Sequence, residues 1–220
     1  CVKEINMKDH SKALNAEKAL IWRIVHISNM ASILDNGLYC RNYINAPILT
    51  PIGNQELIDR RATHPVPISP FGFLNDYIPF YFTPFSPMLL NIKTGRGVPQ
   101  RPNEEIIILV SSLHHIQSLG LDFVFSNMHA YYQWTNFYNN LNDLNNIDWP
   151  LLQNRDFKRD QNDPLKFERY QAEALIHQHC PLTALQGVLC YNEQVKSSIK
   201  DLMSARNINI PIYANPNWYF

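Results

Sequence analysis

One glutamate stands in an apolar segment near the end of the chain. Glu173 is the only charged residue among the last seven of FERYQAEALI (167–176), just after a cluster of charges. Charged side chains are rarely buried unpaired, so Glu173 either points into water or faces a cleft where its charge is used. Composition alone favours the first. In a cleft, a fixed carboxylate can stabilise a cation that forms during a reaction.

Other residues that could carry chemistry lack the spacing that it requires. His26, His64 and His129, with Asp76, are possible zinc or iron ligands, but none of these histidines forms an H-x-x-x-H or H-x-H pair with another. No G-x-S-x-G motif is present, and the seven glycines form neither G-x-x-x-x-G-K-[ST] nor G-x-G-x-x-G. We therefore expect no metal centre, no serine-hydrolase site, no P-loop and no Rossmann dinucleotide site.

The composition describes a chain that can build one full core. It has 220 residues, 45% of them hydrophobic, and its net charge is zero, so any contact with nucleic acid must be local. The four cysteines have no paired spacing and are expected to be reduced and buried; they are Cys1, Cys40, Cys180 and Cys190. No apolar run approaches the roughly 20 residues of a membrane span, and the N-terminus lacks the apolar core of a signal peptide. We expect a cytosolic protein.

The elements that must position these residues are short strands with a few helices between them. Hydrophobic patterning predicts strands at 19–27, 78–84, 105–111, 122–126, 170–177 and 186–191. It predicts helices at 29–36, 55–60, 129–142 and 192–205. Long loops cover 43–72, apart from the turn of helix at 55–60, and 156–169. The pattern favours a single α+β domain over 19–220, with 1–18 as an N-terminal extension that is trimmed or flexible.

Two segments concentrate positive charge. One is the loop before Glu173, with Arg155, Lys158, Arg159, Lys166 and Arg169. The other runs from Lys93 to Arg101 and includes Arg96. Either segment can supply the local contact with nucleic acid that a chain of zero net charge would need. A solvated loop is the alternative for both.

The chain resembles the DarT family of DNA ADP-ribosyltransferase toxins from about Ala19 to Phe220. Five segments in the same order carry the resemblance: WRIVHISNMASILDNGL, ELIDRR, LNDYIPFYFTPFSPML, FVFSNMHAYY and ERYQAEALI. It implies an ADP-ribosyltransferase fold of two small packed β-sheets with surrounding helices and long loops, which binds NAD between the sheets. It also implies transfer of ADP-ribose to single-stranded DNA. In the branch that this chain looks closest to, the acceptor is a ring nitrogen of thymine.

The resemblance assigns three catalytic residues. Glu173 matches the glutamate of the family's Q-A-E motif, which stabilises the sugar cation as nicotinamide leaves. Arg61 matches an essential arginine that engages thymine or the NAD phosphates. Because guanidinium groups stay protonated, we expect Arg61 to stabilise the deprotonated base, with Glu173 as the possible proton acceptor. His129 matches a family histidine that can bind a phosphate, a ribose or the base; capping of a following helix is its alternative.

Four residues are implied contacts of NAD. Arg23 and His26 lie on the first strand, where the family reads the nicotinamide ribose or a phosphate, although many members have histidine in place of Arg23. Asn29 caps the next helix or contacts NAD. Tyr81 stacks on nicotinamide or packs in the core. Asn75 also departs from the family, which commonly has histidine there.

The resemblance further implies a bacterial cytoplasmic enzyme, monomeric and metal-free, that uses NAD as co-substrate and has a macrodomain-type antitoxin. Two other classes stay open on the residues alone. One is an ADP-ribosyltransferase with another acceptor, such as guanine in DNA, RNA or protein. The other is a non-catalytic nucleic-acid-binding module, which would not consume NAD.

Overall fold

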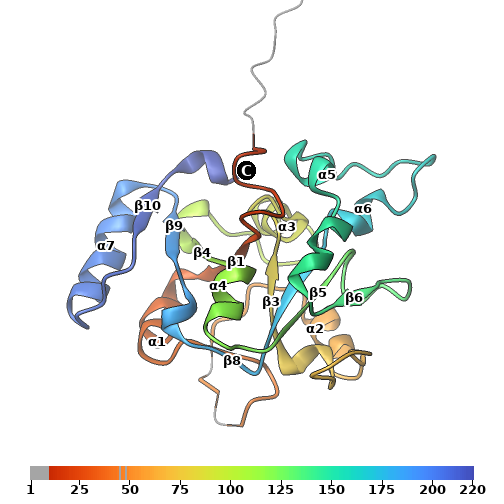
Figure 1. Ribbon diagram of the computed structural model, residues 1–220. Helices are drawn as coiled ribbons and strands as arrows, with labels where there is room; N and C mark the ends of the chain where they lie inside the picture. The colour runs from red at the N-terminus through yellow and green to blue at the C-terminus, as the bar shows by residue number, and fades with distance from the viewer. Residues whose placement is uncertain (1–9, 45, 48) are drawn as a thin grey trace, which may run out of the picture.

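The computed structural model describes residues 10–44, 46–47 and 49–220 (Figure 1). Its strands are β1 Leu20–His26, β2 Leu38–Tyr39, β3 Tyr77–Tyr81, β4 Ile106–Ser112, β5 Phe123–Ser126, β6 Phe137–Tyr138, β7 Glu173–His177, β8 His179–Cys180, β9 Gly187–Cys190 and β10 Ile212–Ala214. Its α-helices are α1 Met30–Asn36, α2 Gln55–Arg61, α3 Pro87–Thr94, α4 Leu113–Ser118, α5 Trp149–Gln153, α6 Lys166–Arg169 and α7 Glu193–Ser204. The α+β class is confirmed.

The main sheet has eight strands in the order β10-β9-β4-β1-β3-β7-β5-β6. β1 pairs with β4 along its whole length, and β3 does the same with β7. Between β1 and β3, however, the register contains one pair, Trp22 with Tyr81. The sheet therefore consists of two four-stranded halves that meet at a narrow seam, whereas the expectation was two separate small sheets. β2 and β8 form a second, two-stranded sheet.

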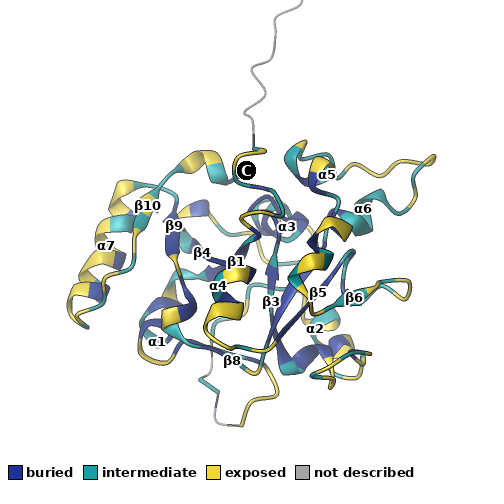
Figure 2. Cartoon of the chain, in the orientation of Figure 1, coloured by how far each residue is buried: buried dark blue, intermediate teal, exposed yellow. Residues whose placement is uncertain are grey.

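The two sides of β7 face different apolar clusters. Ala174 and Ile176 belong to the main core, whereas Leu175 packs with Val66 and Leu74 in a smaller cluster on the opposite side. Side chains alternate along a strand, so Glu173 shares the side of Leu175. Figure 2 shows the central strands buried and the outer surface of α7 exposed.

Short polar side chains set the helix boundaries. Asn54 caps α2 by accepting a hydrogen bond from Leu57, and Asn192 caps α7 in the same way through Val195. α1 ends at Gly37, where φ is +72° and a Cβ would lie 2.5 Å from the carbonyl oxygen of Cys180. Only glycine fits at that position.

The predicted helix at 129–142 is wrong. The segment forms successive turns, the short strand β6 and the start of a 3₁₀ helix at Leu141–Asn146. The turns persist because the carbonyl of His129 accepts hydrogen bonds from the Tyr132 amide and the Thr135 hydroxyl, at 2.8 and 2.7 Å. Side-chain hydrogen bonds of this kind compete with a helix.

The other predicted elements exist, with shifted ends. The strand expected at 170–177 begins only at Glu173, because the preceding residues continue the turn of α6 through hydrogen bonds such as Tyr170 N–H to the Lys166 carbonyl. The loop predicted at 156–169 likewise contains α6. Residues 10–18 lie against the domain, where Leu14 is fully buried and its carbonyl accepts a hydrogen bond from Gln153. Expectations for residues 1–9 concern a segment outside the described residues.

The described ranges contain neither a helix that could span a membrane nor a cluster of metal-binding side chains. Their helices are all too short or too polar to cross a bilayer. The same ranges contain no group of three or more His, Cys, Asp or Glu side chains that could hold a metal ion.

Candidate active site

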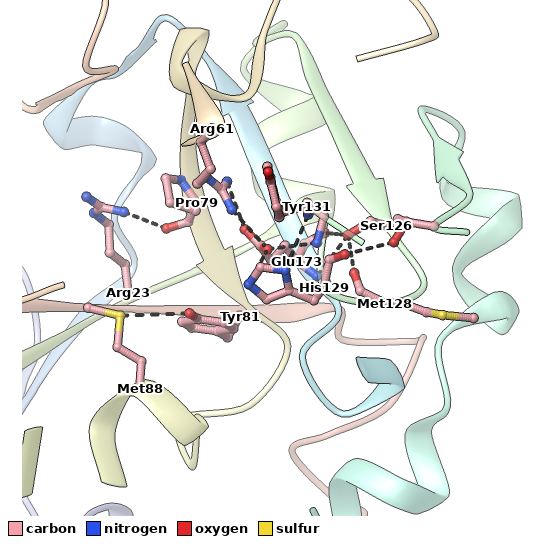
Figure 3. Close-up of polar contacts among 12 residues, drawn as sticks. Arg23, Arg61, Pro79, Tyr81, Met88, Ser126, Met128, His129, Tyr131 and Glu173 are labelled. Atoms are coloured by element: carbon pink, nitrogen blue, oxygen red, sulfur yellow. Dashed lines mark hydrogen bonds and ion pairs between the residues drawn. The ribbon is translucent and has the colours of Figure 1, made fainter. Parts of the chain in front are cut away.

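Glu173 is the first residue of β7 and lies beside the seam of the sheet, paired in register with Tyr81 of β3. Glu173 is only 2% exposed. Oε1 accepts hydrogen bonds from Arg61 Nη1 at 3.2 Å and from the Ala130 amide at 2.9 Å (Figure 3). The structure therefore excludes the first interpretation, in which Glu173 points into water: the carboxylate is buried and paired.

Arg61 reaches this carboxylate from the last position of α2. The Asn75 side chain holds α2 in place, because its Nδ2 donates a hydrogen bond to the carbonyl of Ile58 at 3.1 Å. Arg61 Nη2 lies 3.0 Å from Glu173 Oε2, yet it makes no hydrogen bond of acceptable geometry with any described residue. Nη2 therefore belongs to the ion pair with Glu173, but its hydrogen-bonding capacity is not satisfied by a well-aligned bond.

The loop after β5 completes the surroundings of Glu173. Ser126 accepts a hydrogen bond from the Glu173 amide at 3.2 Å and donates one to the Met128 carbonyl at 2.7 Å. The His129 amide donates to the carbonyl of Glu168 in α6 at 2.9 Å. Together these bonds hold the Ala130 amide against the carboxylate. His129 Nε2 lies 4.0 Å from Glu173 Oε1, beyond hydrogen-bonding distance.

The electrostatics favour an ionised Glu173 beside a neutral His129. Burial by itself raises the pKa of Glu173, but the Arg61 charge, the His129 ring and the hydrogen bonds from Arg61 and Ala130 outweigh it and hold the pKa below its usual value. Burial lowers the pKa of His129, with Glu173 opposing and Arg61 assisting, and the net shift is downward. At neutral pH the site holds one carboxylate, one guanidinium and an uncharged imidazole.

Arg23 and Tyr81 lie at the seam itself. Arg23 Nη1 donates to the Pro79 carbonyl at 2.6 Å, whereas its buried Nε has no hydrogen-bond partner among the described residues. Burial lowers the pKa of Arg23 to about 10, which leaves it charged at neutral pH. Tyr81 packs its hydroxyl against Met88 Sδ at 3.8 Å. Figure 3 shows Arg23 on one side of Pro79 and Arg61 with Glu173 on the other.

The side chains of His26 and Asn29 already form hydrogen bonds with other residues of the protein. His26 contacts Ser28 Oγ through Nδ1 at 2.7 Å and Glu105 Oε2 through Nε2 at 3.2 Å. The Asn29 side chain donates to the Thr50 carbonyl at 3.0 Å and accepts from the Thr50 amide at 2.8 Å. Both side chains therefore tie the end of β1 to neighbouring loops.

Most cations of the basic loop before Glu173 already contact acidic or aromatic side chains of the protein. Arg169 donates two hydrogen bonds to Asp163, at 2.9 and 2.7 Å, and one to Asp148 at 3.0 Å. Lys166 pairs with Asp156 at 2.5 Å. Arg155 lies over the ring of Phe85, 3.6 Å from its centroid, and Arg159 lies over Phe167 at 4.8 Å. Of the five predicted DNA contacts, Lys158 alone has no such partner among the described residues.

Three groups at this site were not found from the sequence. The Ala130 amide carries no side-chain signal, and the polar residue that ends FVFS, Ser126, was the only hint of its role. Asn75 appeared only as a departure from the family pattern. Its contact with α2 depends on the packing of segments 17 residues apart.

Comparisons with known proteins define the class of this fold and site, which is an NAD-dependent ADP-ribosyltransferase. A family model described as "ssDNA thymidine ADP-ribosyltransferase, DarT" matches residues 22–220. A DNA ADP-ribosyl transferase of Escherichia coli O127:H6 is 56% identical over 214 residues, which are 96% of this chain and 98% of the relative. The chain belongs to the DarT family.

Solved structures agree with this assignment. Thermus sp. 2.9 DarT in complex with ADP-ribosylated ssDNA superposes with a TM-score of 0.86 at 29% identity, covering 93% of this chain and 97% of the other. The same protein in complex with NAD⁺ gives a TM-score of 0.82 at 29% identity, covering 93% and 98%. The family, the fold and NAD as co-substrate are therefore confirmed, and the class of non-catalytic binding modules is not supported.

Proposed function

We propose that this protein transfers ADP-ribose from NAD to a thymine ring nitrogen in single-stranded DNA through Glu173, Arg61 and His129. The observation that carries this proposal is the buried Arg61–Glu173 pair. It keeps an ionised carboxylate buried, only 2% exposed, between the Arg61 guanidinium and the Ala130 amide. Such a group stabilises positive charge strongly, because little water screens it and it need not reorganise during the reaction.

The chemical step follows from these charges. The bond between the ribose C1′ and the nicotinamide nitrogen breaks, its electron pair stays with nicotinamide, and C1′ becomes cationic. Glu173 stabilises this cation. Thymine N3 then donates an electron pair to C1′ and loses its proton to Glu173, while Arg61 stabilises the negative charge that develops on the base. His129, neutral and 4.0 Å from the carboxylate, orients the ribose or the base by hydrogen bonding.

NAD binding is assigned to the seam. Arg23 supplies an unpaired positive charge that suits an NAD phosphate, and its free Nε adds a donor. Tyr81, next to Glu173 in register, offers a ring face to nicotinamide. His26 and Asn29 support this site from the end of β1 by holding Ser28 and Thr50, because their own polar atoms are already in use.

DNA contacts divide between two roles. Lys158 and Arg159 contact the DNA backbone from the loop before α6. Arg155, Lys166 and Arg169 are engaged by aromatic or acidic side chains, and they shape that loop so that it supports Glu173. We further propose a bacterial cytoplasmic toxin, acting as a monomer and opposed by a cognate macrodomain-type antitoxin, because the family resemblance implies all of these.

Labelled NAD incubated separately with thymine-containing single-stranded DNA, thymine-free DNA, RNA and protein tests the acceptor. We expect label only on the thymine-containing DNA, with release of nicotinamide. Label on guanine-only DNA, RNA or protein would move the enzyme to another acceptor class, and NAD left intact in every reaction would exclude catalysis.

A further inference from the structure

Residues 65–73 form a hairpin after α2. Pro65 and Phe73 are joined by an antiparallel bridge, and the Val66 amide donates to the Gly72 carbonyl at 2.8 Å. At its turn the hairpin exposes two large rings, because Phe71 is 57% and Phe73 45% exposed. Exposed phenylalanine rings are unfavourable in water, so two of them at one turn call for a reason.

The backbone at this turn is strained. Phe71 has φ +67°, which residues with a side chain rarely adopt. Gly72 follows with φ +93°, and a Cβ there would lie 2.7 Å from Asp76 Oδ2. A strained residue persists only where its surroundings hold it, and such residues cluster at functional sites.

Hydrogen bonds from neighbouring residues hold this strained turn in place. The Tyr77 hydroxyl donates to the Phe71 carbonyl at 2.6 Å, and the Asp76 carboxylate accepts from the Phe73 amide at 2.7 Å. Asn139, next to β6, donates to the Ser69 carbonyl at 3.1 Å. The rings are therefore held outward by an ordered backbone.

The hairpin lies on the same side of the sheet as Glu173. Its inner residue Val66 packs with Leu175, two positions after Glu173 on β7. His64, at the base of the hairpin, contacts the ring of Tyr131 with centroids 4.9 Å apart, and Tyr131 follows His129 and Ala130 in the loop that lines the site. Contacts therefore connect the loop that lines the site, through Tyr131 and His64, to the base of the hairpin.

We infer that Phe71 and Phe73 form a stacking platform for nucleotides that flank the acceptor thymine. The inference rests on the proposed function. Unpaired bases stack on aromatic side chains whatever their sequence, and the neutral chain has no general basic surface to hold the strand. Because these contacts place the hairpin beside the loop of His129, on the Glu173 side of the sheet, the substrate strand is its occupant.

Steady-state transfer by Phe71→Ala/Phe73→Ala tests the platform on two oligonucleotides with one thymine each. The long one has several nucleotides on both sides, and the short one has one on each side. We expect KM for the long strand to rise about tenfold. The KM for the short strand, the KM for NAD and kcat at saturating DNA stay unchanged. Phe71→Tyr/Phe73→Trp, which keeps the ring faces, retains the low KM.

Tyr213→Ala is the matched control, because Tyr213 is also 57% exposed but lies on β10 at the opposite end of the sheet. An unchanged KM for the long strand in the double alanine variant overturns the inference. An equal loss on the short strand, or in Tyr213→Ala, overturns it as well. Wild-type protein that modifies neither strand would instead overturn the proposed function.

Discussion

Two arginine–carboxylate groups flank the start of β7, and they differ in how completely their hydrogen bonds are satisfied. Arg169 uses Nε, Nη1 and Nη2 on Asp148 and Asp163. Arg61 is more deeply buried, yet its Nη2 makes no hydrogen bond within the described chain. A saturated pair supports structure. The Arg61–Glu173 pair is equally close, but it is less completely hydrogen-bonded than the Arg169 group.

The two arginine–carboxylate groups also differ in what they contribute to the stability of the fold. A partly exposed pair such as Arg169–Asp163 contributes little to stability, because water and salt screen it. Burying Arg61 and Glu173 removes both charges from water, and this desolvation can exceed their attraction. The fold bears that cost at the point where the proposed reaction needs a negative charge.

Glu173→Gln gives the largest expected effect. It keeps the size of the side chain and removes the charge, so we expect NAD-dependent transfer to fall by at least about 100-fold. Transfer rates with saturating NAD and DNA measure this. Asp163→Asn, the same chemical change in the other pair, should stay within about fivefold of wild type. Equal losses in the two variants would remove the distinction between the pairs.

Arg61→Ala sharpens the comparison through stability. It leaves a buried carboxylate with the Ala130 amide as its remaining hydrogen bond, and breaking a buried pair costs about 3–5 kcal/mol. Urea unfolding at pH 7 measures this loss. Arg61→Ala/Glu173→Gln should recover part of it, because no unpaired charge stays buried. A double variant less stable than Arg61→Ala would contradict this explanation.

The pH dependence of stability is a smaller effect. The pKa of His129 is lower in the folded protein than its usual 6.5, so the unfolded chain takes up the proton first and stability falls as pH drops below about 6.5. The lowered pKa of Glu173 adds a second loss below about pH 4.5. Melting temperatures from pH 8 to 4 measure both. Burial also lowers the pKa of His64, so His129→Gln should reduce the first loss without abolishing it, and should keep the second.

The smallest expected effect is on DNA binding by Lys158, the cation of the basic loop that has no acidic or aromatic partner among the described residues. Lys158→Ala should reduce the salt dependence of single-stranded DNA binding by about 0.7 in the slope of log K against log salt, the value for one phosphate contact. Lys166→Ala, which removes a cation already paired with Asp156, should leave the slope unchanged. Fluorescence anisotropy at several salt concentrations separates the two.

Local patterns predicted most strands and the position of Glu173, because alternation and apolar runs are properties of neighbouring residues. The helix predicted at 129–142 failed because Thr135 bonds the carbonyl of His129. The contacts of the basic loop join residues that are distant in the sequence. Arg169 pairs with Asp148, 21 positions before it, and Arg155 lies over the ring of Phe85, 70 positions before it. Charge counts could therefore locate the basic loop, but they could not reveal which of its cations are paired with acidic side chains or lie over aromatic rings.

Mass spectrometry of oligonucleotides with a single thymine tests the central claim most directly. Wild-type protein with NAD should add ADP-ribose to that thymine, fragmentation should locate the addition on the base, and Glu173→Gln should add none within the same time. Modification by Glu173→Gln at a rate near that of wild type, or an adduct on another base, would contradict the account.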